Sequence, residues 1–270
     1  MKNFKYSLRT LYGAIVLFFL LVASDTQSIA QEISVWQFRN VEQSNMEEFI
    51  ERETTYWSKV AEAAIEKGNL NFWGLFVKQG GFDLPTNPNV LFINTFKDID
   101  AANMGEIWNP SAVFPDTPIE EMETGSLSKT LHMFFVQPQN WVQKEGAVPD
   151  EQFNYVRFIF HNSNAPGDLI ALENEHWAPF IKSAMEAGHT TQLAWGNATI
   201  LAPSGPMIEA NTISYDIYPT LSGALTGGFP ADAEIEFPEE GLDKINEIEI
   251  NRRIDNVYQR IQVISASPPQ

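Results

Sequence analysis

The 270-residue chain contains no cysteine, and this absence excludes disulfide bridges and a lipid anchor attached to a cysteine side chain. The folded protein must therefore be stabilised by its packed core alone, which a chain of about 240 residues after export is long enough to form. Basic residues are also scarce, because 17 Lys and Arg residues face 35 Asp and Glu residues, for a formal net charge of −18. Such a chain repels nucleic acids and anionic membrane surfaces, so we expect neither as a partner.

The common catalytic motifs are missing as well. The sequence contains no G-x-S-x-G nucleophile elbow, no P-loop, no dinucleotide-binding G-x-G-x-x-G and no zinc-binding H-E-x-x-H. The four histidines, His132, His161, His176 and His189, do not have the spacing of a metal site. Neither nucleotide-dependent chemistry nor a metal site is therefore predicted.

The first thirty residues have the pattern of a secretory signal peptide. Three basic residues within the first nine precede an almost wholly apolar run over residues 11–23. This run is too short to cross a bilayer as a helix, and Ser28 and Ala30 provide the small side chains that a signal peptidase recognises. We therefore expect cleavage near Ala30, a periplasmic or secreted protein, and no stable membrane anchor after cleavage.

The most informative feature that is present is an internal repeat. At an offset of 120 residues the matched pairs are Phe38 and Phe158, Glu53 and Glu173, Trp57 and Trp177, Ala64 and Ala184, Glu66 and Glu186, and Gly68 and Gly188. At an offset of 122 residues Trp73-Gly74 matches Trp195-Gly196, and Phe96 matches Tyr218. Ordered matches of two uncommon residue types indicate a duplicated unit.

The hydrophobic periodicity of each half predicts the order strand, helix, strand, strand, helix, strand. In the first half these elements are a strand over 33–41, a helix from Ser44 to Gly68, strands over 72–78 and 90–96, a helical stretch over 99–108 that resumes over 118–129, and a strand over 131–137. In the second half they are a strand over 155–161, a helix over 169–187 ended by Gly188, strands over 192–201 and 212–218, a helix over 238–256 and a strand over 258–264. Pro179 should kink the long helix of the second half, whereas that of the first half should run straighter.

This order is the ferredoxin-like βαββαβ plan. Two such halves, each with a Trp near the middle of its first helix and a Gly at its end, resemble the dimeric α+β barrel superfamily in its fused, two-repeat form. That superfamily includes proteins similar to NIPSNAP, antibiotic-biosynthesis-type monooxygenases and chlorite-dismutase-like haem proteins. The resemblance implies an α+β fold in which two tandem ferredoxin-like repeats pack as an intramolecular dimeric α+β barrel, with a cavity between sheet and helices in each half.

The resulting organisation is a signal peptide over 1–30, a first repeat over 31–137, a linker over 138–150 and a second repeat over 151–270. Because one chain supplies both halves of the barrel, either a monomer or a homodimer is compatible with the resemblance. Activities in this superfamily are diverse, so function has to be argued from a site.

Two histidines are the best candidates for chemistry. His176 lies in the segment Glu175-His176-Trp177 of the second long helix, and His161 ends the preceding strand. In the fold that the resemblance implies, both line one cavity, where they would serve as an acid–base pair or as a haem ligand. The alternative is that His176 only packs its helix, as its counterpart Tyr56 would do in the first half.

Aromatic side chains are candidates for binding a flat or apolar ligand. The predicted ligand-binding residues are Tyr56, Trp57, Trp73, Glu175, His176, Trp177 and Trp195. Core packing is the favoured alternative for the four tryptophans, because large aromatic side chains at these spacings usually hold a helix to a sheet. Arg39 and Arg157, in the first strand of each half, are expected to face solvent rather than a buried carboxylate.

These observations favour an exported protein that binds a small apolar or aromatic molecule. One alternative is a cofactor-free monooxygenase-like or haem-dependent enzyme that uses His176 or His161, in which the haem is suggested by the resemblance alone. Another is a periplasmic interaction module that docks a partner through the acidic segment over residues 227–241.

Overall fold

The computed structural model describes residues 32–80, 87–100, 102–203, 209–230 and 235–266. The predicted signal peptide and its cleavage site lie outside these ranges. Within them, no helix combines the length and the apolar character that a membrane crossing requires.

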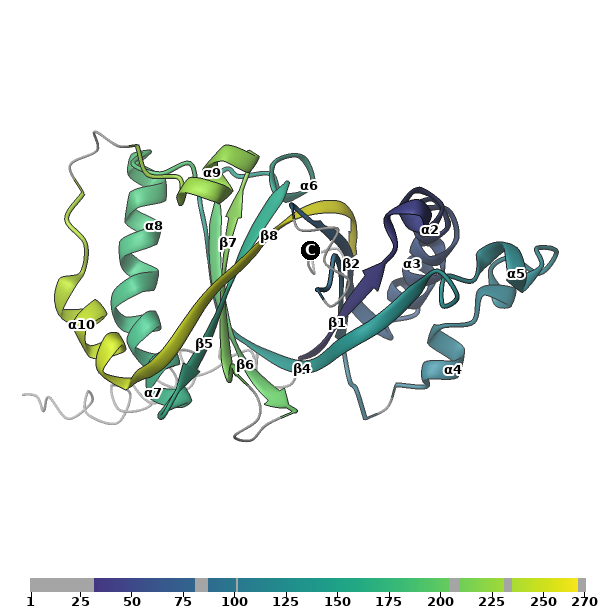
Figure 1. The fold of residues 1–270 in the computed structure, drawn as a ribbon, viewed down its shortest axis with the longest axis horizontal. Helices are drawn as coiled ribbons and strands as arrows, with labels where there is room; N and C mark the ends of the chain where they lie inside the picture. Colours follow the sequence, from purple (N-terminus) through teal and green to yellow (C-terminus); the bar gives the residue numbers. More distant parts are fainter. Residues whose placement is uncertain (1–31, 81–86, 101, 204–208, 231–234, 267–270) are drawn as a thin grey trace, which may run out of the picture. The chain divides into compact units, whose positions relative to one another are not determined.

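The two halves repeat one order of elements (Figure 1). The first half contains β1 (Ile33–Val41), α2 (Met46–Arg52), the π-helical turn η2 (Glu53–Trp57), α3 (Ser58–Glu66), β2 (Leu70–Lys78), β3 (Val90–Phe96), α4 (Met104–Ile107), α5 (Ile119–Met122) and β4 (Ser128–Gln143). After α6 (Pro149–Gln152), the second half contains β5 (Tyr155–Ser163), α7 (Pro166–Leu172), the π-helical turn η4 (Glu173–Trp177), α8 (Ala178–Ala187), β6 (Ala194–Ala202), β7 (Thr212–Tyr218), α9 (Leu221–Thr226), α10 (Glu239–Ile248) and β8 (Glu249–Ser265).

The eight strands form one closed antiparallel barrel in the order β1-β3-β2-β8-β5-β7-β6-β4. The long strands β4 and β8 join the halves, because β4 pairs with β1 and also with β6, while β8 pairs with β5 and also with β2. Closure leaves none of the eight described strands with an unpaired edge, which protects them from pairing with another chain. The predicted fold class, two tandem ferredoxin-like repeats packed as an intramolecular dimeric α+β barrel, is confirmed.

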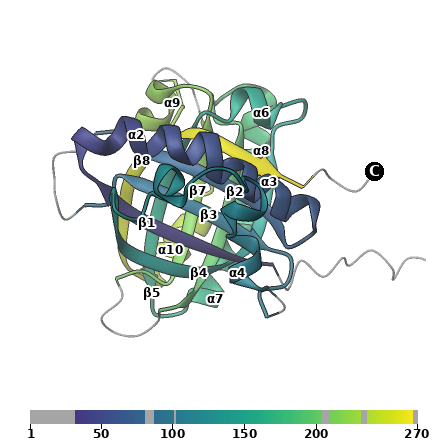
Figure 2. The same ribbon diagram turned by 90° about the vertical axis from the view of Figure 1, so that its right-hand side faces the viewer.

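Successive side chains along each strand point alternately into the barrel and toward the helices. They form one core inside the barrel and outer cores between the sheet and the helices of each half. Trp36, Phe38, Phe158 and Phe160 belong to a core inside the barrel, which receives side chains from both halves. The outer face of each sheet packs against the long helix of its own half. Figure 1 shows α2 and α3 on one flank of the barrel and α7, α8 and α10 on the other, and Figure 2 shows α2 and α3 crossing the wall formed by β1, β2 and β3.

Both long helices end as predicted and share an interruption that was not predicted. Gly68 and Gly188 have φ angles of 74° and 72°, in the left-handed region that favours glycine after a helix. A π-helical turn interrupts each helix at the same place in the repeat. Because the first-half helix has the same turn without a proline, the turn does not require Pro179.

The elements that differ most from prediction are those that reach into the other half. The helix expected over 238–256 ends at Ile248, and β8 begins at Glu249. Strand β4 continues through Gln143, into the predicted linker, because its second part pairs with β6. The added length of β4 pairs with β6 of the opposite repeat, whereas the added first part of β8, residues 249–257, pairs with β5 of its own repeat. Both pairings join residues far apart in the chain and leave no local signal in the sequence.

Candidate functional site

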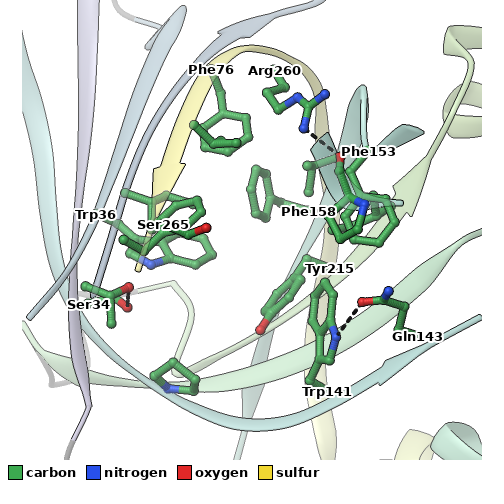
Figure 3. Close-up of a pocket in the computed structure, with 18 of the residues that line it drawn as sticks. Ser34, Trp36, Phe76, Trp141, Gln143, Phe153, Phe158, Tyr215, Arg260 and Ser265 are labelled. Atoms are coloured by element: carbon green, nitrogen blue, oxygen red, sulfur yellow. Dashed lines mark hydrogen bonds between the residues drawn. The ribbon is translucent and has the colours of Figure 1, made fainter. Parts of the chain in front are cut away.

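A cavity of about 310 Å³ lies inside the barrel, enclosed by inner faces from both halves (Figure 3). Its apolar lining residues are Trp36, Phe72, Phe76, Ile93, Pro138, Trp141, Pro149, Phe153, Val156, Phe158, Tyr215, Ile217 and Val263. Its polar lining residues are Ser34, Thr95, Gln143, Asp150, Arg260 and Ser265. We call this space the barrel cavity. It lies on the opposite side of the sheet from the cavity that the sequence analysis expected between sheet and helices.

Aromatic rings form much of the cavity wall. The Trp36 ring meets the Phe158 ring edge-to-face, with 5.1 Å between ring centroids, and lies 6.3 Å from the Tyr215 ring. The Trp141 ring lies 6.0 Å from Tyr215 and 6.1 Å from Phe153. Contacts of this kind stabilise the rings in fixed orientations, so the wall is largely pre-formed.

The two halves contribute unequally to this wall. At positions related by the 122-residue offset, the first half has Phe72 and Ile93 where the second has Ala194 and Tyr215. Tyr215 fits because Gly196 lies on the strand beside it, where an added Cβ would come within 2.6 Å of the phenol ring. The repeated glycine in Trp195-Gly196 therefore makes room for a cavity-lining ring.

The solvent-facing rim of the barrel cavity is formed near α6. Trp141 is 44% exposed and Asp150 is exposed. The Arg260 guanidinium on β8 donates hydrogen bonds to the carbonyl oxygens of Pro149 and Asp150, at 2.7 and 2.6 Å. Arg260 thereby fixes the segment between the repeats across one side of the opening.

A second group of polar side chains lies on the helix-facing side of the second half. His161 is buried, with Nδ1 2.5 Å from Glu249 Oε1 and Nε2 3.1 Å from Ser214 Oγ. Ser214 donates to Glu173 Oε1 at 2.6 Å, and Asn197 donates to Glu173 Oε2 at 3.0 Å. Both ring nitrogens of His161 thus have protein partners, and the group forms a closed, buried network.

The first half places its corresponding glutamate beside an arginine. Glu53 is buried at the start of η2 and accepts a hydrogen bond from Thr124 Oγ1 at 2.6 Å. Burial raises the pKa of Glu53 to about 7, although Thr124 and the nearby Arg39 guanidinium oppose the rise. Arg39 lies over the Phe92 ring, 4.9 Å from its centroid, and donates to Gln37. The equivalent glutamates of the two repeats, Glu53 and Glu173, are therefore both buried against the outer face of their sheet, with different partners.

Arg157 was expected to face solvent, but it forms an ion pair with a buried carboxylate. Its Nε and Nη2 donate to Asp216 Oδ2 at 3.0 and 2.6 Å, and 20% of its side chain is exposed. Burial raises the pKa of Asp216, and the Arg157 guanidinium acts against that rise. The prediction was wrong because the carboxylate partner lies on β7, far away in the sequence.

The four predicted tryptophans pack against other parts of the fold outside the barrel. Trp73 and Trp195 are buried in the helix-facing cores, as the core-packing alternative predicts. Trp57 is half-buried and donates its indole N–H to the Met122 carbonyl oxygen at 2.8 Å. Trp177 packs on the Phe180 ring, 5.1 Å between centroids.

The remaining predicted residues lie on or near the helix surface. Tyr56 packs edge-to-face against Phe114 at 5.3 Å, and Glu175 is 72% exposed. His176 packs against α10, where an added Cβ on Gly241 would lie 2.3 Å from the His176 Cβ. The described contacts bring His161 and His176 to different neighbours, and none of the seven predicted ligand-binding residues lines the barrel cavity.

The residues of the barrel cavity were missed, although one signal was available. Alternation in the first strand of each repeat separates Trp36 and Phe38 from Val35 and Gln37, and so marks an aromatic inner face. Nothing in a single strand shows that eight such faces close around a common space.

Comparison with known proteins agrees on the fold. No protein-family model and no curated protein sequence matches the chain. Among solved structures, it is similar to an anthrone oxidase-like protein, with a TM-score of 0.52 and 10% identity over 88% of this chain and 94% of that one. It is also similar to a candidate monooxygenase of Lactobacillus acidophilus, with a TM-score of 0.52 and 12% identity over 87% of this chain and 97% of that one. A candidate monooxygenase of Fusobacterium nucleatum has a TM-score of 0.50 and 10% identity over 87% of this chain and 94% of that one. At these identities the similarity shows the ferredoxin-like dimeric α+β barrel fold and no activity.

Proposed function

We propose that this protein is exported and binds a small apolar or aromatic molecule in the barrel cavity. The observation that carries the proposal is the cavity itself, a largely aromatic space with few polar groups at the centre of the fold. Ligand sites in proteins are typically concave, mostly apolar and largely pre-formed, with volumes from about 300 Å³ upward. A cavity of about 310 Å³ has room for roughly two or three fused rings.

Export is supported by the N-terminal sequence. Cleavage after Ala30 would remove three basic residues and one acidic residue, and would change the formal charge from −18 to −20. We expect the protein recovered from the periplasm or the medium to have the mass of a chain that begins at Gln31. Recovery of the uncleaved chain in the membrane fraction would contradict this part of the proposal.

Filling the barrel cavity tests the binding proposal. Val263 on β8 is equivalent to Trp141 on β4, at an offset of 122 residues. Val263→Trp therefore introduces a residue that the protein already has at the equivalent position. With fluorene as the probe, we expect the wild-type protein to bind and the variant to bind at least about tenfold more weakly, because the new ring occupies the space. Equilibrium dialysis measures both affinities.

The control is Leu225→Trp, which adds the same ring on α9, where Leu225 is 63% exposed. This variant should bind fluorene as the wild type does, and circular dichroism should show that both variants are folded. Equal fluorene binding by wild type and Val263→Trp would place the ligand elsewhere and overturn the proposal.

The enzyme alternative ranks second because the described lining of the barrel cavity includes no imidazole. Both nitrogens of His161 are already hydrogen-bonded, and His176 packs against α10. An axial ligand for a haem in this cavity is therefore not provided by either histidine. A Soret band from the purified protein, or oxygen uptake with an electron-rich aromatic compound, would favour the enzyme over the binding protein.

A further inference from the structure

Two hydrogen-bond donors on the wall of the barrel cavity have no partner in the described part of the chain. They are the hydroxyl group of Tyr215 and the indole N–H of Trp36 on the cavity wall. Neither is among the fully enclosed polar atoms that lack a partner, so both are accessible from the cavity. Their rings lie 6.3 Å apart between centroids, so both groups border the same part of the cavity. Buried Tyr and Trp side chains usually satisfy these groups, and donors that face an apolar space without a partner point to an acceptor on the molecule that occupies it.

The phenol of Tyr215 is held in place from several sides. Gly196 lets the ring lie directly on β6, and the rings of Phe158 and Trp141 flank it at 6.4 and 6.0 Å. Burial alone raises the pKa of Tyr215, so the hydroxyl group keeps its proton well above neutral pH. The cavity therefore presents a pre-positioned, neutral donor.

A pair of hydroxyl groups adds to the polar part of the wall. Ser34 Oγ and Thr95 Oγ1 are 2.7 Å apart and buried. Only one of the two can donate to the other, which leaves one O–H directed elsewhere. In Figure 3, the Tyr215 hydroxyl points away from Arg260 and toward the side of the cavity where Ser34 lies.

Charge at the other end of the cavity does not favour an anionic ligand. Arg260 already donates to two backbone carbonyl oxygens, and also contacts Asn154 Oδ1 at 3.4 Å. The exposed carboxyl group of Asp150 lies at the same rim, and the whole chain is strongly acidic. A negatively charged molecule would be repelled during its approach and desolvated at a cost inside the barrel.

We infer that the barrel cavity selects a neutral, flat aromatic molecule that carries a carbonyl or hydroxyl oxygen, and that the Tyr215 hydroxyl donates a hydrogen bond to this oxygen. Trp36 N–H is the second donor, and the surrounding rings contact the aromatic body of the ligand. This inference rests on the proposed function, because it assigns specificity to the same cavity.

The test compares two probes of nearly the same shape, fluorene and 9-fluorenone, which differ in a methylene and a carbonyl group. We expect the wild type to bind 9-fluorenone roughly fivefold more tightly than fluorene, the effect of one net hydrogen bond. Tyr215→Phe should remove this preference and leave fluorene binding unchanged, because the ring contacts remain. Tyr56→Phe, which removes a phenol outside the cavity, should keep the preference.

An infrared spectrum of bound 9-fluorenone provides a readout that a purely structural role of Tyr215 would not change. The carbonyl stretching band should lie at lower frequency in the wild-type complex than in hexane, and should move back toward the hexane value in Tyr215→Phe. Trp36→Phe should produce a smaller change in the same direction.

Equal affinity of the wild type for both probes, or a preference that survives Tyr215→Phe, would overturn the inference. The proposed function is judged separately, by whether fluorene binds at all and whether Val263→Trp abolishes that binding. If fluorene binds and Val263→Trp blocks it, only the role of Tyr215 is in question. If neither probe binds the wild type, both proposals are wrong.

Discussion

Replacement of Arg157 by valine is expected to lower the free energy of unfolding by about 3 kcal/mol at neutral pH. Asp216 is buried and accepts two hydrogen bonds from Arg157 and one from Gln192. Without the guanidinium, the buried carboxylate would keep only neutral partners, the Gln192 amide and the Tyr218 hydroxyl group. The expected loss is at the lower end of the range for buried pairs, because 20% of the Arg157 side chain is exposed. Urea denaturation followed by circular dichroism measures it.

The first half of the chain supplies the control for this experiment. Arg157 faces Asp216 across β5 and β7. Strand pairing relates β1 to β5 by 122 residues, and not by the 120 of the Phe38–Phe158 match, so the equivalent pair in the first half is Val35 facing Asn94 across β1 and β3. The double variant Arg157→Val/Asp216→Asn therefore recreates a pair that the protein already contains. We expect the double variant to lower the free energy of unfolding by about 2 kcal/mol less than the two single variants do in sum. Strictly additive losses would show that the ion pair contributes no coupling energy.

A second large effect is expected in the pH dependence of stability, from Glu53. Burial raises the pKa of its carboxyl group from 4.5 to about 7 in the folded protein. Below pH 4.5 the group is protonated in both the folded and the unfolded chain, and its burial then carries no ionisation penalty. Between pH 4.5 and 7 only the unfolded chain ionises, so stability is lost as the pH rises. The complete loss from this group should be about 3 kcal/mol, and should be reached above pH 7.

Glu53→Gln should remove this contribution, because glutamine keeps the shape and can still accept the hydrogen bond from Thr124. Relative to the wild type, the variant should gain about 3 kcal/mol between pH 4.5 and a pH above 7. The matched control is Glu51→Gln, which changes an exposed carboxyl group two residues earlier, in α2. This variant should have the same dependence of stability on pH as the wild type. Parallel profiles for wild type and Glu53→Gln would show that the Glu53 carboxyl ionises in the same way in the folded and unfolded chains.

Elements governed by local signals were predicted well. Strand β7 has the predicted bounds, and the glycines after both long helices have the left-handed conformation expected at that position. The repeat gave the order of elements twice, which made the ferredoxin-like plan recognisable. The π-helical turns were missed because the residues of the predicted stripe keep three- and four-residue spacings across them, as Ile50, Glu53, Trp57 and Val60 do.

The candidate site was predicted less well, for a physical reason. Helical spacing drew attention to Trp57, Trp177 and His176, which lie on the helices that flank the barrel. The tryptophans at 73 and 195 lie on strands, but on the outer face that these helices cover. The aromatic residues that line the barrel cavity lie on the inner faces of β1, β2, β4, β5 and β7, apart from Phe153, which lies between α6 and β5.

The amino-acid sequence by itself determined the duplicated plan, the ends of the long helices, the alternation of inner and outer faces and the acidic charge, because each depends on neighbouring residues or on composition. Tertiary structure decided which strands cross between the repeats, which carboxylate meets Arg157, and that the inner faces enclose a cavity. These features depend on contacts between residues far apart in the chain. They exist only once β4 and β8 have paired with the opposite repeat and closed the barrel.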